Sequence, residues 1–303
     1  MVRLAAAFAS QGDRVDLILV RAFGPYLEEV AEEVRIVELG SRGVLHAMPK
    51  LVRYLRSERP HIVMSTLPHA NIALVTARAL ARTGTPVVVR EASTRSFVRH
   101  TGFAVKRRVT AGLVASSYRH ADATVAVSAG VADDLLEAFG VNPSQLHVIH
   151  NPVIDSDLEA RARVPLDDPW FASDMPPVIM SVGRLSEEKD FPTLLRALAR
   201  VRERRTARLL LLGEGSDRPR LERLVQELGI AEAVRLPGFV ANPYPYMARA
   251  SVYVLSSQRE GLPSALIQAM ACGCPVVSTD CPSGPAEILL DGELGELIPV
   301  GDV

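Results

Sequence analysis

The chain has 303 residues, with 34 Lys and Arg, 35 Asp and Glu, and a formal net charge of −1. Apolar residues make up 48% and charged residues 23%, which is ordinary for a globular protein long enough for two domains. Nucleic-acid binding is disfavoured because it calls for a strong excess of positive charge. No stretch approaches the roughly 18 uninterrupted apolar residues of a membrane-spanning helix.

Charge is divided unevenly along the chain. Residues 1–150 hold 18 Lys and Arg against 13 Asp and Glu, a net charge of +5, and all seven histidines. Residues 151–303 hold 16 against 22, a net charge of −6. The sequence therefore predicts two domains with different partners.

Hydrophobic periodicity predicts an α/β protein. The first ten residues are typical of a helix rather than a signal peptide, because the apolar run is short and Gln11-Gly12 ends it before a strand. Apolar strands then alternate with helical stretches, which predicts parallel sheets with right-handed crossovers. The expected strands are 15–20, 61–65, 86–90, 122–127, 146–149, 178–182, 207–212, 251–255 and 275–278.

A basic segment follows the third of these strands. Its five cations are interleaved with two phenylalanines, a composition that suits an anionic membrane surface or a lipid-linked phosphate. A solvated basic helix face is an equally good interpretation, and the alternatives stay open at this point. The cations are Arg95, Arg99, Lys106, Arg107 and Arg108.

Prolines interrupt the pattern between residues 151 and 177. They predict an interdomain linker at residues 156–176, between a first domain at 1–155 and a second at 177–303. Asp155 and Asp157 have a spacing that can hold a divalent cation, but two acids in such a segment are more typical of a turn and a helix cap. We therefore predict no metal site.

Two polar groups in the second half point to a phosphate-bearing ligand. In the first, the strand Val178 to Val182 ends at Gly183, which allows a sharp turn. Arg184 and Lys189 then flank a loop before a helix. Arg as a planar fork and Lys as a point charge can together clamp a diphosphate. The alternative is a pair of solvated surface cations.

In the second group, Glu260 precedes the turn Leu262-Pro263-Ser264, which leads into a helix containing Gln268. Free N–H groups at a helix start favour an anion. A carboxylate beyond the carboxyl end of a strand lies where open α/β sheets bind ligands, so Glu260 can accept hydrogen bonds from sugar hydroxyls. Gln268 can do the same for a ribose. The alternative is a capping acid and a surface amide.

Three cysteines, Cys272, Cys274 and Cys281, lie close together in the sequence. They lack the paired arms of a zinc site, and residues 274–278 are typical of a buried strand. We predict structural thiols in a reducing cytosol.

From about residue 178 onward the chain resembles the nucleotide-sugar domain of the retaining glycosyltransferases of family four, which have the GT-B fold. That resemblance implies two facing, doubly wound Rossmann-like domains, and places Gly238 and Phe239 beside the donor. The matching motifs are V-G-R-x-x-x-x-K at 182–189, a glycine-bearing strand end at 212–215, L-P-G-F at 236–239, E-G-x-P at 260–263 and A-x-G-x-P-V-V at 271–277.

Three departures from the family pattern bear on activity. Gln268 stands where relatives carry a second glutamate, and Ala92 where many carry a histidine. Relatives also begin with a further strand and a glycine-rich loop, and continue into helices beyond residue 301. We expect this form to bind a donor but to transfer sugar poorly, with activity returning when both ends are extended.

The resemblance implies retaining transfer of a hexose or N-acetylhexosamine from a nucleoside diphosphate sugar, most often UDP-linked, to a glycan or lipid-linked acceptor. Arg184, Lys189 and Glu260 would be catalytic, without a metal or other cofactor, in the cytoplasm or at the inner face of the plasma membrane. The alternatives are an epimerase or hydrolase of the same fold, and a binding module without turnover. A dinucleotide oxidoreductase fits worse, because residues 213–218 lack the third glycine of G-x-G-x-x-G.

Overall fold

The computed structural model describes residues 1–24, 27–94 and 104–303, and of residues 104–111 the backbone only. It divides into two compact units, one of Met1–Val127 with Val131–Pro152 and the other of Ser128–Gly130 with Val153–Val303. The domain boundaries at 155 and 177 stay predictions. The segment expected as a linker packs on the second unit, because Leu158 and Trp170 are buried in its core.

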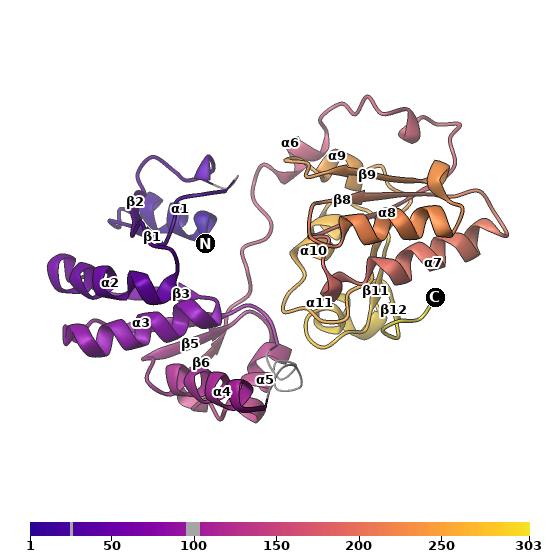
Figure 1. Cartoon of the computed structure of the whole chain (residues 1–303). Helices are drawn as coiled ribbons and strands as arrows, with labels where there is room; N and C mark the ends of the chain where they lie inside the picture. The colour runs from indigo at the N-terminus through magenta and orange to yellow at the C-terminus, as the bar shows by residue number, and fades with distance from the viewer. Residues whose placement is uncertain (25–26, 95–103) are drawn as a thin grey trace. The chain divides into compact units, whose positions relative to one another are not determined.

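The first unit alternates strands and helices, and its strands form two parallel sheets, β1-β2 and β3-β4-β5-β6 (Figure 1). A helix at the start and parallel pairing are as predicted, whereas β2 was not expected. The elements are α1 (Val2–Ser10), β1 (Asp16–Leu19), β2 (Arg35–Glu38), α2 (Val44–Glu58), β3 (Val63–Thr66), α3 (Pro68–Ala81), β4 (Val87–Glu91), α4 (Ala104–Arg119), β5 (Ala123–Ala126), α5 (Ala129–Phe139) and β6 (Leu146–Val148).

The second unit is built on one six-stranded parallel sheet of order β12-β11-β10-β7-β8-β9. Two of its strands, β9 and β12, were not among those expected. The elements are α6 (Leu158–Ala162), β7 (Val178–Val182), α7 (Phe191–Arg202), β8 (Arg208–Leu212), α8 (Arg218–Glu227), β9 (Val234–Gly238), α9 (Tyr244–Met247), β10 (Val252–Leu255), α10 (Ser264–Ala271), β11 (Val276–Thr279), α11 (Pro285–Leu289) and β12 (Glu296–Ile298).

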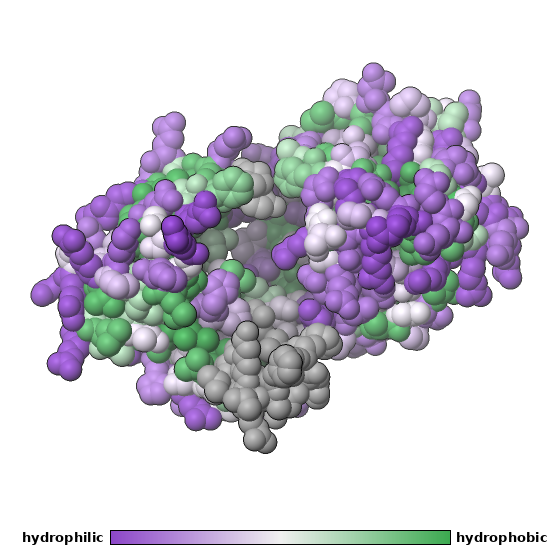
Figure 2. All heavy atoms as spheres, in the orientation of Figure 1, coloured by the Kyte–Doolittle hydropathy of each residue, from purple (hydrophilic) through white to green (hydrophobic). Residues whose placement is uncertain are grey.

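The second sheet is buried on both faces. Along β8, Leu209 and Leu211 belong to one apolar cluster with α7 and α8, while Leu210 and Leu212 belong to another with α9 and α10. Successive strand residues point to opposite faces, so this alternation means that helices cover both sides of the sheet. The doubly wound prediction is confirmed for this unit, whose visible outer face over α7 and α8 is largely hydrophilic (Figure 2).

The three cysteines are free thiols, two of them buried and Cys272 half-buried. Burial raises the pKa of the Cys274 thiol to about 11 and that of Cys281 to about 12. Both therefore stay protonated at neutral pH, when a thiol is a poor nucleophile and metal ligand. Their burial fits the predicted structural role.

Candidate functional site

The two polar groups meet because their strands are neighbours in the sheet. β7 and β10 run parallel, with Val252 beside Ile179 and Tyr253 beside Met180. Their carboxyl ends therefore lie at one edge of the sheet, where open α/β folds bind ligands. Gly183, which follows β7, and Glu260, in the loop after β10, are brought to the same place although they lie far apart in the sequence.

Close backbone packing shapes this edge, but at a different glycine from the one expected. Added to Gly183, a Cβ atom would make only ordinary van der Waals contacts, with the Lys189 side chain at 3.5 Å and with Phe191 at 3.7 Å. Added to Gly213, which has a φ of 140°, the same atom would lie 1.9 Å from the carbonyl oxygen of Gly183. The sharp constraint on the loop after β7 is therefore imposed by Gly213, at the end of the adjacent strand.

Gly213→Ala is expected to lower the free energy of unfolding by at least about 3 kcal/mol, because it adds a backbone clash to an unfavourable φ. Gly229→Ala is the matched control, since Gly229 has a φ of 66° with nothing within 4 Å of its added Cβ. It should cost only about 1–2 kcal/mol. Urea unfolding of both variants measures the difference, and equal losses would contradict the close approach at Gly213.

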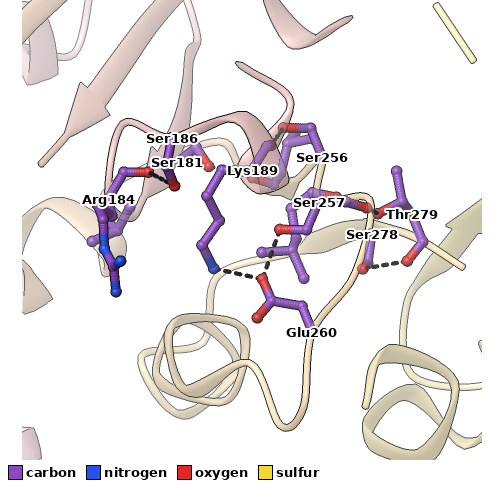
Figure 3. Close-up of polar contacts among 12 residues, drawn as sticks. Ser181, Arg184, Ser186, Lys189, Ser256, Ser257, Glu260, Ser278 and Thr279 are labelled. Atoms are coloured by element: carbon purple, nitrogen blue, oxygen red, sulfur yellow. Dashed lines mark hydrogen bonds and ion pairs between the residues drawn. The ribbon is translucent and has the colours of Figure 1, made fainter. Parts of the chain in front are cut away.

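An ion pair lies at the centre of the edge. Lys189 Nζ is 2.6 Å from Glu260 Oε1, and the two side chains are 21% and 12% exposed. The Ser257 hydroxyl donates to the same carboxylate oxygen at 2.6 Å (Figure 3). The carboxylate is thus held by a cation and a hydroxyl, in a position open enough for a ligand to reach it.

A layer of hydroxyl groups, not predicted from the sequence, supports this pair. The Ser256 hydroxyl donates to the Lys189 carbonyl oxygen at 2.7 Å, and the Thr279 hydroxyl donates to that of Ser257 at 2.6 Å (Figure 3). Ser256 and Ser257 directly follow β10, and Thr279 ends β11. Hydroxyl residues at the carboxyl ends of predicted strands were the signal that could have found this layer.

Arg184 is exposed, and its guanidinium extends from the loop in the same direction as the Lys189 amine (Figure 3). Burial alone would raise the pKa of nearby Glu188, but a backbone N–H, the Ser186 hydroxyl and the positive charges of Arg184 and Arg259 together hold it below its ordinary value. Glu188 therefore stays ionised at neutral pH. The loop therefore presents two cations, Arg184 and Lys189, of which Lys189 is already paired with Glu260. It also presents the ionised side chain of Glu188.

The turn after Glu260 is placed as expected. Leu262 is buried, and Pro263 occupies the N-cap of α10 without a side-chain cap. The first N–H groups of α10, from Ser264, are therefore not satisfied by a capping side chain, which suits a nearby anion. The anion itself stays a prediction.

The other predicted contacts lie elsewhere in the second unit. Gln268 donates from Nε2 to the Tyr244 hydroxyl at 3.2 Å, so its amide faces α9 rather than the ion pair. Gly238 ends β9 with a φ of 96°, and Phe239 beyond it is 54% exposed. The roles of these three residues beside a donor remain predictions.

Asp157 occupies the N-cap position of α6 but makes no side-chain cap hydrogen bond. Asp155 lies 4.0 Å from Arg161. The predicted capping role of these two acids stays a prediction. In the described ranges, no group of three or more His, Cys, Asp or Glu side chains is placed to hold a metal ion. Of the predicted membrane-contact residues, Arg95 and Arg99 lie outside the described residues, as do the side chains of residues 106–108.

Comparison with known proteins identifies the family. The model described as "Glycosyltransferase Family 4" matches residues 1–157, more than half of the chain, and "Glycosyl transferases group 1" matches residues 176–303. The chain belongs to glycosyltransferase family 4. The first match ends and the second begins within the segment 156–176 that was predicted as a linker.

The names of two curated relatives place them in bacterial glycan synthesis. The first, N-acetylgalactosamine-N,N'-diacetylbacillosaminyl-diphospho-undecaprenol 4-alpha-N-acetylgalactosaminyltransferase of Campylobacter jejuni, is 36% identical over 62% of this chain and 49% of its own length. The second, the lipopolysaccharide core biosynthesis glycosyltransferase LpsE of Rhizobium meliloti, is 35% identical over 62% of this chain and 52% of its own. The aligned part of this chain therefore spans about half the length of these relatives.

Solved structures match nearly the whole chain. Anabaena HepE in complex with UDP and glucose has a TM-score of 0.76 at 21% identity, covering 99% of this chain and 82% of that one. WaaG, a lipopolysaccharide-biosynthesis glycosyltransferase, has a TM-score of 0.77 at 16% identity, covering 98% and 80%. These likenesses establish the fold, and the predicted GT-B class is confirmed.

Proposed function

We propose that the chain is a retaining glycosyltransferase that moves a hexose or N-acetylhexosamine from a UDP-sugar to a glycan or lipid-linked acceptor. The observation that carries this proposal is the partly exposed ion pair of Lys189 and Glu260 at the carboxyl edge of the second sheet. With Arg184 alongside, the site offers two cations for a diphosphate and one carboxylate for sugar hydroxyls. A nucleoside diphosphate sugar needs both kinds of group within one small site.

The residues have separate roles in this proposal. As the bond between sugar and phosphate lengthens, negative charge grows on the departing diphosphate, and Arg184 and Lys189 stabilise it. Glu260 orients the sugar hydroxyls, and the departing diphosphate helps to take the proton from the acceptor hydroxyl. Gln268 would contact the ribose only after leaving Tyr244.

The names of the relatives support the acceptor class. The Campylobacter relative is named for a diphospho-undecaprenol acceptor, and LpsE for the lipopolysaccharide core. By extension, this chain acts in cell-surface polysaccharide or glycolipid synthesis, at the cytoplasmic face of the membrane. Over the described ranges, no helix is long and apolar enough to cross a bilayer.

The direct test supplies radiolabelled UDP-glucose, UDP-galactose and their N-acetyl forms together with lipid-linked acceptors. The proposal predicts a labelled glycolipid whose new linkage keeps the anomeric configuration of the donor. Free sugar as the main product would favour a hydrolase, and an altered UDP-sugar an epimerase. Binding of a UDP-sugar with slow transfer is the result expected of this form, whereas binding with no product from any acceptor would favour a binding module.

Uridine diphosphate should bind more tightly than guanosine or adenosine diphosphate. This preference is taken from the family, because residues 236–240 do not by themselves specify a base. HepE supports it, since that structure contains UDP. Side-by-side calorimetric titration with the three nucleotides measures the preference, and tighter binding of a purine nucleotide would contradict it.

Transfer should persist in EDTA, because Arg184 and Lys189 supply the positive charge that a divalent cation would otherwise bring to the diphosphate. The measurement is the rate of transfer before and after addition of the chelator. Loss of turnover that manganese restores would overturn this prediction and direct attention to Asp155 and Asp157.

A further inference from the structure

Arg90 is set apart from its neighbours on β4. Along that strand Val87, Val89 and Glu91 are buried, whereas Arg90 is only half-buried. Alternate residues of a strand point to opposite faces, so the guanidinium lies on the other face from the carboxylate of Glu91. That carboxylate has its own partners, since the Tyr118 hydroxyl donates to it at 2.6 Å.

Among the described residues, the hydrogen bonds from the Arg90 guanidinium all go to neutral oxygen atoms. Its guanidinium donates from Nη1 to the Thr66 hydroxyl at 3.0 Å and from Nη2 to the Asn151 side-chain oxygen. No carboxylate of the described residues lies within ion-pair distance of it. Arg78 in the same unit differs, because its guanidinium is 3.1 Å from the carboxylate of Asp122.

Partial burial of a cation without an ion-pair partner is unfavourable. Desolvation accordingly lowers the pKa of the Arg90 guanidinium below its ordinary value, although the negative charge of Glu91 acts in the opposite direction. An arginine still keeps its proton at neutral pH. The position would be relieved by an anion that forms a direct ion pair with the guanidinium. A phosphate matches a guanidinium best, because two of its oxygens can accept two parallel hydrogen bonds.

The surroundings of Arg90 suit a phosphate carried by an aliphatic chain. Thr66 ends β3 and Asn151 lies just beyond β6, so the guanidinium lies at the carboxyl edge of the first unit's four-stranded sheet. Leu67, next to Thr66, is 48% exposed, and Ile149, two residues before Asn151, is 57% exposed. Each neutral partner of Arg90 is thus close in sequence to an exposed aliphatic side chain.

We propose that Arg90 is the phosphate-binding residue of a site in the first unit for a prenyl phosphate or diphosphate, the carrier end of a lipid-linked acceptor. This inference rests on the proposed function, which it narrows to a phosphate-bearing lipid acceptor. The nucleotide also carries phosphate, so the experiment must separate the two sources.

Farnesyl diphosphate is a suitable probe, titrated by calorimetry into the full chain while UDP saturates the second unit. Wild-type protein should bind it, and bind it more tightly than inorganic pyrophosphate under the same conditions. Arg90→Gln should weaken farnesyl diphosphate binding by about 10- to 100-fold, the effect of losing hydrogen bonds to a charged group. The affinity for UDP should be unchanged in this variant.

Arg53→Gln is the matched control, because Arg53 is an exposed arginine of α2 in the same unit. It should change farnesyl diphosphate binding by less than about twofold, as expected for a surface charge. Arg90→Lys keeps the charge but loses the fork, and should fall between wild type and Arg90→Gln. Thermal unfolding of each variant shows whether the first unit has stayed folded.

Three results would overturn the assignment of Arg90. They are farnesyl diphosphate binding that UDP abolishes, equal binding by wild type and Arg90→Gln, and loss of UDP affinity in Arg90→Gln. Failure of the proposed function would look different, because the wild-type chain would then bind no UDP-sugar, or bind one without forming a labelled glycolipid, whatever Arg90 binds.

Discussion

Replacing Lys189 by Ala is expected to weaken the binding of uridine diphosphate and to lower the rate of sugar transfer by about 100- to 1000-fold. The amine lies at the carboxyl edge of the second sheet, where charge on a departing diphosphate would develop. Arg184→Ala should act in the same direction, because both cations serve the same group. Calorimetry measures the affinity, and single-turnover transfer measures the rate.

Arg196→Ala is the control for these variants, because Arg196 is an exposed arginine of α7 in the same unit. It should leave affinity and rate within about twofold of wild type. If both Lys189→Ala and Arg184→Ala bound UDP and transferred sugar like wild type, the diphosphate clamp would be wrong.

Glu260→Gln should slow sugar transfer without weakening the binding of UDP. Lys189 Nζ donates to Glu260 Oε1 at 2.6 Å, so a diphosphate must compete with the carboxylate for the amine. A neutral amide removes that competition, and UDP should bind as tightly as to wild type or up to about tenfold more tightly. Sugar transfer should fall by about 10- to 100-fold, because the charged acceptor of the sugar hydroxyls is lost.

Titration with UDP and a transfer assay on the same preparation separate these effects. Glu187→Gln is the control, since Glu187 is an exposed acid on the same loop and neither measurement should change by more than about twofold. Weaker binding of UDP to Glu260→Gln would mean that the carboxylate does not compete for Lys189. Unchanged transfer would remove Glu260 from the sugar.

The principal residues of the candidate site could be found from the sequence because each lies at or just beyond a strand end. Gly183 and Lys189 follow β7, and Glu260 follows β10. Their meeting could be anticipated only through the family, since strand order brings β7 beside β10 and nothing local in the sequence encodes it. The ion pair between Lys189 and Glu260 is not predicted from the sequence, because the sequence pattern assigns both charges to the ligand.

Other features depend on tertiary packing and were missed or placed differently. The segments 35–38 and 296–298 are too short and too polar to be predicted as strands. They nevertheless form strands, because they pair with β1 and β11. Trp170 lies in a proline-rich stretch typical of a linker, but Arg235 stacks on its ring at 4.1 Å and fixes it to the second unit. Gln268 faces the Tyr244 hydroxyl instead of solvent or a ligand.

A crystal structure of the chain with a UDP-sugar bound tests the central claim most directly. We expect the Lys189 amine to have left Glu260 and to lie about 3 Å from a β-phosphate oxygen. The Glu260 carboxylate should then accept hydrogen bonds from the sugar hydroxyls while keeping the one from Ser257. A bound nucleotide with the Lys189–Glu260 ion pair intact, or a diphosphate bound away from Arg184 and Lys189, would contradict the account.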